Sequence, residues 1–95
     1  MIQIKTPKEI EAMREACRIS AGALRAGGEA IRPGATTADV DKAIYDYIVS
    51  PGARPNFKGL YGFPGSACIS VNQELIHGIP SKKVVLREGD IVSID

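Results

Sequence analysis

Helix and strand signals are segregated along this sequence, and their order is what most constrains the fold. The first helix begins after Thr6, a good N-cap, with Pro7 at the first helical position and Glu9 completing a capping box. The Arg32-Pro33-Gly34 run ends it. Its apolar residues recur at spacings of three and four, which predicts one buried face of an amphipathic helix: Ile10, Met13, Cys17, Ala21 and Leu24.

A second helix begins directly after the first one ends. Thr36 or Thr37 can cap it, and Asp39 supplies a first-turn carboxylate that suits the helix dipole. It ends before residues 50–52, and its apolar face comprises Val40, Ala43, Ile44, Tyr47 and Ile48. Neither helix carries an inward-facing group of polar residues, so we expect both helices to serve as scaffold.

The pattern changes after residue 52. Glycine, proline and aromatic residues predict a loop up to residue 65, and residues 66–71 then alternate small or polar with apolar side chains, which predicts a strand. We expect residues 74–77 to return as the second arm of a hairpin, and residues 91–95 to form a final strand. Helices followed by strands with short connections predict an α+β fold with a mostly antiparallel sheet.

Charge and composition exclude several classes of protein. The 95 residues include 12 Lys and Arg against 11 Asp and Glu, and the resulting net charge of +1 gives no electrostatic signature for DNA or an anionic membrane surface. No apolar run approaches the roughly 18 residues of a membrane-spanning helix, and the N-terminus lacks a secretory signal. Cys17 and Cys68 lie far apart and outside any CxxC pattern, which predicts reduced thiols. We therefore expect a cytoplasmic protein.

The length of the chain leads to a separate expectation. The chain ends on a strand pattern, Gly89-Asp90-Ile91-Val92-Ser93-Ile94-Asp95. Natural chain termini, in contrast, usually continue into polar, disordered residues. We therefore expect these 95 residues to be a piece of a longer protein.

Two side chains could carry chemistry, and the residues alone also allow a structural role for each. His77, the single histidine, precedes Gly78 at the end of a predicted strand, where an imidazole could exchange hydrogen bonds with a substrate or simply be exposed. Asp95 ends an apolar strand, where it either is solvated or, if buried, needs a partner or a metal ion. These two groups do not complete a metal site, which takes about three to six ligands.

The loop before the predicted strand supplies the other candidates. Phe57, Tyr61, Phe63 and Cys68 could line a pocket for an apolar side chain, or they could pack the loop onto the core. No base lies near Cys68 in the sequence, so we do not interpret it as a nucleophile. The residues alone thus leave both a cleft and a packed loop open, and they do not identify any chemistry.

Several runs of residues occur together in an order and at spacings typical of one family. The first half contains Ile4-Lys5-Thr6-Pro7 and Arg32-Pro33-Gly34. The second half contains more specific runs: Gly62-Phe63-Pro64, Ser66-Ala67-Cys68-Ile69-Ser70-Val71-Asn72, His77-Gly78-Ile79-Pro80 and the closing run from Gly89 to Asp95. Over essentially all of its length, the chain resembles the N-terminal half of type I (bacterial-type) methionine aminopeptidases.

The resemblance implies a fold, a reaction and cofactors. The fold is the pita-bread fold, in which two related halves pack around a curved antiparallel sheet, with residues 1–95 as the N-terminal half of a single metallopeptidase catalytic domain. The reaction is removal of the initiator methionine from nascent polypeptides by hydrolysis at two divalent metal ions, among which the sequence does not distinguish Co, Mn, Fe and Zn. Backbone carbonyls near Asn72 and Glu74 match a monovalent-cation site of some members.

The resemblance also implies roles for particular residues. Asp95 matches the first of the family's metal-ligating side chains, and His77 matches a catalytic histidine that contacts the substrate around the scissile peptide. Phe63 and Cys68 match walls of the pocket for the methionine side chain. The implied partners are N-terminal methionyl peptides and nascent chains at the ribosome, for an enzyme that is a monomer when full length.

The chain departs from the family pattern beside this pocket. Leu60 and Tyr61 stand where many members have an aromatic residue and then His or Asn, so one wall is aliphatic and the expected polar contact to substrate is the Tyr61 phenol. The later metal ligands, another Asp, a His and Glu residues by family pattern, would lie beyond Asp95. We therefore expect the 95 residues alone to be inactive, with poor stability and an exposed sheet edge.

Two other functions are compatible with the same fold. One is a non-catalytic pita-bread binding module, and the other is a proline-specific pita-bread aminopeptidase or prolidase. The early helix start and the His77-Gly78-Ile79-Pro80 run favour the methionine-specific group.

Overall fold

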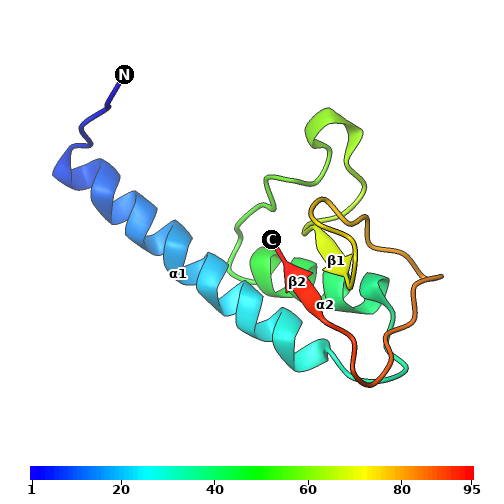
Figure 1. Cartoon of the computed structure of the whole chain (residues 1–95). Coiled ribbons are helices and arrows are strands. Elements are labelled where there is room, and N and C mark those ends of the chain that lie inside the picture. Colours follow the sequence, from blue (N-terminus) through cyan, green and yellow to red (C-terminus); the bar gives the residue numbers. More distant parts are fainter.

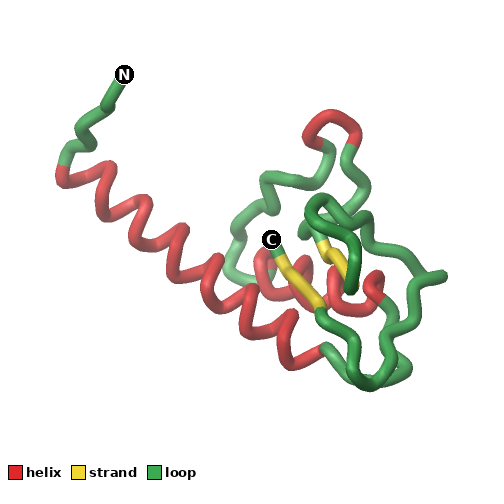
Figure 2. Tube along the Cα trace, viewed as in Figure 1, coloured by secondary structure: helices red, strands yellow, loops and turns green.

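The computed structural model describes all 95 residues, and loops and turns make up most of the chain after the second helix (Figures 1 and 2). The regular elements are α1 (Pro7–Ala30), α2 (Thr37–Val49), the 3-10 helix η1 (Leu60–Gly62), β1 (Ile69–Val71) and β2 (Val92–Ile94). None of these helices is long and apolar enough to cross a membrane. The expected order of helices followed by antiparallel strands is confirmed.

Both helices begin at the predicted caps. Glu9 donates its amide to Thr6 Oγ1 at 3.2 Å, and the Glu9 carboxylate accepts from the Thr6 amide at 2.9 Å. Thr36 forms the same reciprocal pair with Asp39, at 3.1 and 2.9 Å, which identifies Thr36 as the cap of α2. The Thr6 and Thr36 amides, which donate to these carboxylates, hold the pKa of Glu9 and Asp39 below the ordinary value, because they stabilise the ionised form.

The core lies between the two helices and one face of the strand pair. β1 and β2 are antiparallel, with Ile69 opposite Ile94 and Val71 opposite Val92. Because successive side chains of a strand alternate between faces, these residues turn together toward the helices. The core cluster consists of Ala23, Val40, Ile44, Ala67, Ile69, Val71 and Leu86.

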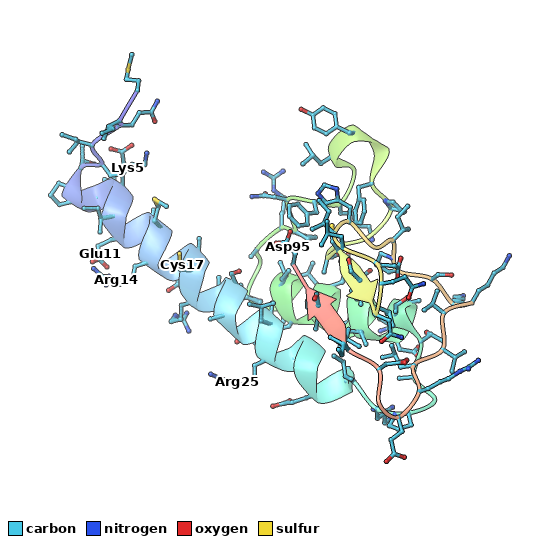
Figure 3. All side chains as sticks on the ribbon, in the orientation of Figure 1. Lys5, Glu11, Arg14, Cys17, Arg25 and Asp95 are labelled. Carbon is cyan, nitrogen blue, oxygen red and sulfur yellow. The ribbon has the colours of Figure 1, made fainter.

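The predicted buried face of α1 is wrong along the whole helix. All five of its residues are exposed, including Ala21 and Leu24, and the residues that α1 buries are Ala23 and Gly27. The first half of α1 extends beyond the rest of the molecule, as the positions of the labelled residues along it show (Figures 1 and 3), and the second half packs through a different face. The helices approach each other closely at Gly27, where an added Cβ would lie 2.8 Å from Ile44 Cδ1.

The predicted hairpin arm over residues 74–77 is also wrong. β1 pairs with β2 instead, while Leu75 and Ile76 are exposed and His77 has a φ of 60°, which is incompatible with an extended strand. Pairing with β2 is favoured because it turns two apolar residues of each strand into the core. The other edge of β1 donates one backbone hydrogen bond, from Ile69 N–H to Gly78 O.

Candidate functional site

One cavity gathers four of the predicted site residues. It has a volume of about 420 Å³ and is lined by Tyr61, Phe63, Cys68 and His77. Five further residues line it: Phe57, Leu60, Gly62, Pro64 and Ile79. The cavity therefore has one wall from residues 57–64, a second wall from residues 77–79, and Cys68, at the start of the strand region, as its most buried lining residue.

The first wall is a loop with an unusual backbone. Gly59, Tyr61 and Gly62 have φ values of 85°, 49° and 78°, and Gly59 N–H donates to Phe63 O at 2.8 Å. Phe57 and Phe63 meet edge to face, with ring centroids 6.5 Å apart. Tyr61 is fully exposed, so its phenol lies at the rim of the cavity. Left-handed backbone at a non-glycine residue is costly and is often found at functional sites.

Cys68 contributes a neutral and weakly polar surface to the cavity. Burial raises the pKa of the Cys68 thiol, and the Asp95 and Asp41 carboxylates raise it further. The thiol is therefore protonated at neutral pH. This agrees with a role as a pocket wall and with the expectation that Cys68 is not a nucleophile.

His77 is held at the second wall through its neighbour. Gly78 N–H donates to Ser70 Oγ at 3.0 Å, and Gly78 O accepts from Ile69 N–H at 2.8 Å. Both bonds attach residue 78 to the edge of β1. They fix the position from which the exposed His77 borders the cavity.

Changing Gly78 to alanine is expected to lower the free energy of unfolding by about 3 kcal/mol, at the upper end of the cost of overpacking. An added Cβ would lie 2.0 Å from the Ile69 carbonyl oxygen and 2.8 Å from Ser70 Cα, which are backbone atoms of a buried strand. Gly28→Ala is the matched control, because nothing lies within 4 Å of a Cβ there. Urea unfolding measures the free energy of unfolding of both variants. Equal values for Gly78→Ala and Gly28→Ala would contradict the close approach of Gly78 to the backbone of β1.

Asp95 directly follows β2 (Figure 3), and it is not among the residues that line this cavity. Cys68 and Asp95 exchange both backbone hydrogen bonds, at 2.8 and 2.9 Å, so they are direct neighbours across the ladder, with Cβ atoms about 5 Å apart. Asp95 also borders a second cavity of about 410 Å³ that reaches Leu24 and Phe57. The chain contains no group of three or more His, Cys, Asp and Glu side chains placed to hold a metal ion.

The structure adds site residues that the sequence did not single out. Ile79 lines the second wall, and no periodicity in its short run could have identified it. The expectation that neither helix directs polar groups inward is wrong, because Thr37 and Asp41 of α2 bond to Ser81 and to the backbone of residues 66–67. The only available signal was their spacing of four residues, which places them on one face of a helix.

Comparison with known proteins identifies the family of this chain. The profile of metallopeptidase family M24 matches residues 11–95. The chain belongs to metallopeptidase family M24. It is 53% identical over 95 residues to a methionine aminopeptidase of Clostridium acetobutylicum and 50% identical to methionine aminopeptidase 1 of Bacillus subtilis, and each match covers 100% of the chain and 38% of the relative.

Solved structures support the same relationship for this M24 chain. It resembles a crystal structure of methionine aminopeptidase from Thermotoga maritima with a TM-score of 0.94 and 45% identity, covering 99% of this chain and 38% of that one. The methionine aminopeptidase of Rickettsia prowazekii gives a TM-score of 0.93 at 38% identity, again over 38% of its length. The expected α+β class and pita-bread fold are confirmed, and the chain spans 38% of the length of these relatives.

Proposed function

We propose that this chain is the N-terminal part of a methionine aminopeptidase catalytic domain and carries the pocket for the N-terminal methionine side chain. The observation that supports this most is the single cavity shared by Phe63, Cys68 and His77, in a chain 53% identical to a methionine aminopeptidase. Each of these residues comes from a different run of the sequence. Their convergence is what a binding pocket requires.

The walls of the cavity suit a methionine side chain. Phe57, Phe63 and Leu60 provide apolar and aromatic surface, and a thioether makes favourable contacts with aromatic rings. The neutral Cys68 thiol adds no charge that the substrate would have to desolvate. The same composition disfavours a polar or charged N-terminal side chain.

Two polar groups at this cavity can orient the peptide. His77 borders it with an imidazole, a group that can exchange a hydrogen bond with the scissile peptide. The Tyr61 phenol at the rim is a second hydrogen-bonding group, placed to contact the substrate outside the pocket. In this proposal His77 is the catalytic residue of the chain, and Tyr61 is a binding residue.

Asp95 fits the role of one metal ligand. Its oxygen donors suit divalent cations, and every ion pair of the chain joins other residues. A pair of bound divalent ions would polarise the scissile carbonyl and supply an activated water. A single carboxylate cannot hold them, so the remaining ligands must come from polypeptide other than these 95 residues. A monovalent cation near the carbonyls of Asn72 and Glu74 belongs to the same proposal.

The proposed substrates are N-terminal methionyl peptides and nascent chains, met at the ribosome in the cytoplasm by a monomeric enzyme. The names of the relatives support the peptide substrate. The net charge of +1 agrees with a peptide substrate in preference to DNA or a membrane surface.

A chimera tests this function directly. In it, these 95 residues replace the matched 38% of the Clostridium acetobutylicum methionine aminopeptidase. With Co²⁺ or Mn²⁺ added, the chimera is expected to release methionine from the peptide Met-Ala-Ser and to leave Ala-Pro-Ser intact, as measured by amino-acid chromatography. The 95 residues alone are the negative control, with no release expected. A folded, metal-loaded chimera that releases no methionine would contradict the proposal, and cleavage of Ala-Pro-Ser alone would indicate a proline-specific enzyme.

A further inference from the structure

Two polar side chains of α2 bond to the segments that carry the two walls of the cavity. Thr37 and Asp41 are four residues apart, so they lie on one face of the helix, one turn from each other. Thr37 is only 1% exposed, and Asp41 is half-buried. The opposite face of α2 carries an exposed ion pair between Lys42 and Asp46 at 2.6 Å.

Asp41 holds the segment that follows the first wall. Its Oδ1 accepts hydrogen bonds from the Ser66 amide at 2.8 Å and the Ala67 amide at 2.9 Å. These two residues lie between the loop of residues 57–64 and Cys68. Two amides on one carboxylate oxygen are charge-assisted hydrogen bonds, which are stronger than neutral ones.

Thr37 holds the segment that follows the second wall. Its Oγ1 accepts from the Ser81 amide at 2.9 Å and donates to the Ser81 carbonyl at 3.2 Å. Ser81 lies two residues beyond Ile79, the last lining residue of this wall. The side-chain hydroxyl therefore satisfies both backbone groups of one residue.

The two segments also contact each other between these attachment points. A Cβ on Gly65 would lie 2.8 Å from Pro80 Cγ and 3.2 Å from Asp41 Oδ1. Gly65 is buried, and it lies one residue before the amides that Asp41 binds. Pro80 lies one residue before Ser81. The segments are thus in contact at their bases, and each is attached there to the same helix face.

We propose that Thr37 and Asp41 are positioning residues that set the separation of the two cavity walls and, through it, the selectivity for the N-terminal side chain. Neither residue touches the cavity, so neither is catalytic. Their effect on turnover rests on the proposed function. Their effect on the cavity itself does not.

The first test measures opening of the cavity in the chimera, whose folding is verified by circular dichroism, and needs no activity. N-ethylmaleimide labelling of buried Cys68 is followed by peptide mass spectrometry, with exposed Cys17 as the internal reference. Asp41→Ala and Thr37→Val are each expected to raise the Cys68-to-Cys17 labelling ratio about tenfold, because each removes two hydrogen bonds. Asp41→Asn and Thr37→Ser keep the acceptor oxygen and are expected to stay near wild type.

Asp46→Ala is the matched control, because it removes a carboxylate from the exposed face of the same helix. Asp41→Asn keeps a hydrogen-bond acceptor but removes the negative charge. It therefore distinguishes loss of the hydrogen bonds from loss of the Asp41 charge, which contributes to the raised pKa of Cys68. Wild-type labelling in Asp41→Ala and Thr37→Val would overturn the proposal. So would an equal rise in Asp46→Ala, or a full rise in Asp41→Asn.

The second test uses the chimera and compares peptides with N-terminal Met and Leu. Asp41→Ala and Thr37→Val are expected to raise KM for the methionyl peptide about tenfold with little change in kcat, and to reduce the Met-to-Leu ratio of kcat/KM. Asp41→Asn and Thr37→Ser are expected to restore both. Equal falls in kcat for both peptides, with the ratio unchanged, would show a general loss of structure and overturn the selectivity role. An inactive wild-type chimera contradicts the proposed function alone, and the labelling test still decides the positioning role.

Discussion

Changing His77 to alanine in the chimera is expected to lower kcat/KM for a methionyl peptide by about a hundredfold or more, while the metal content stays at the wild-type value. His77 borders the cavity and supplies an imidazole there, whereas Asp95 is the proposed metal ligand. Removing the imidazole therefore removes a hydrogen bond to the scissile peptide and leaves the metal site intact. Steady-state kinetics and elemental analysis of the same preparation measure both quantities.

The backbone at His77 requires a second variant. Its φ of 60° is left-handed, a conformation in which alanine is strained and asparagine is tolerated. If loss of the imidazole causes the fall in kcat/KM, His77→Asn also loses most of the activity. Full activity in His77→Asn with a large loss in His77→Ala would show that the backbone conformation matters and would contradict a catalytic role. Wild-type turnover in both variants would contradict it as well.

Changing Asp95 to asparagine is expected to lower the divalent-metal content of the chimera at least about tenfold at limiting metal, because a neutral amide replaces a charged carboxylate ligand. The fold should persist, since the hydrogen bonds between Asp95 and Cys68 involve backbone atoms only. Metal per chain is measured by mass spectrometry after dialysis, with circular dichroism to verify folding. Asp46→Asn removes the same charge from the exposed face of α2 and should retain full metal content. Full metal content in Asp95→Asn would remove Asp95 from the ligand set.

The two expectations about fold that proved wrong have a common cause. The spacing of Ile10, Met13 and Cys17 predicts an apolar helix face, but a spacing does not say which face another element covers, and α1 packs through Ala23 and Gly27 instead. Residues 74–77 had an apolar pair and a preceding turn, yet residues 91–95 formed the better partner for β1. In both cases the outcome depended on competition between distant segments, which periodicity does not describe.

The candidate site likewise combines residues that the sequence indicated with an arrangement that only the structure shows. The residues alone left open whether Phe57, Phe63 and Cys68 line a pocket or pack onto the core, and the motif series favoured the pocket. The structure places these residues around one cavity with His77. Asp95 does not line that cavity, but its backbone forms two hydrogen bonds with the backbone of Cys68, which does. No pattern in the sequence indicated that Thr37 and Asp41 attach both walls.

The sequence by itself determined the features that depend on neighbouring residues. The capping boxes at Thr6 and Thr36 act over three residues, so each forms whatever the rest of the chain does. The alternation of apolar and polar residues in β1 likewise indicates an extended segment, although both of its faces are buried in the structure. Only the tertiary structure decided which strand pairs with β1, which part of α1 is buried, and how α2 holds the cavity walls. Those outcomes require contacts between segments far apart in the chain, and their free energy depends on every element that competes for the same surface.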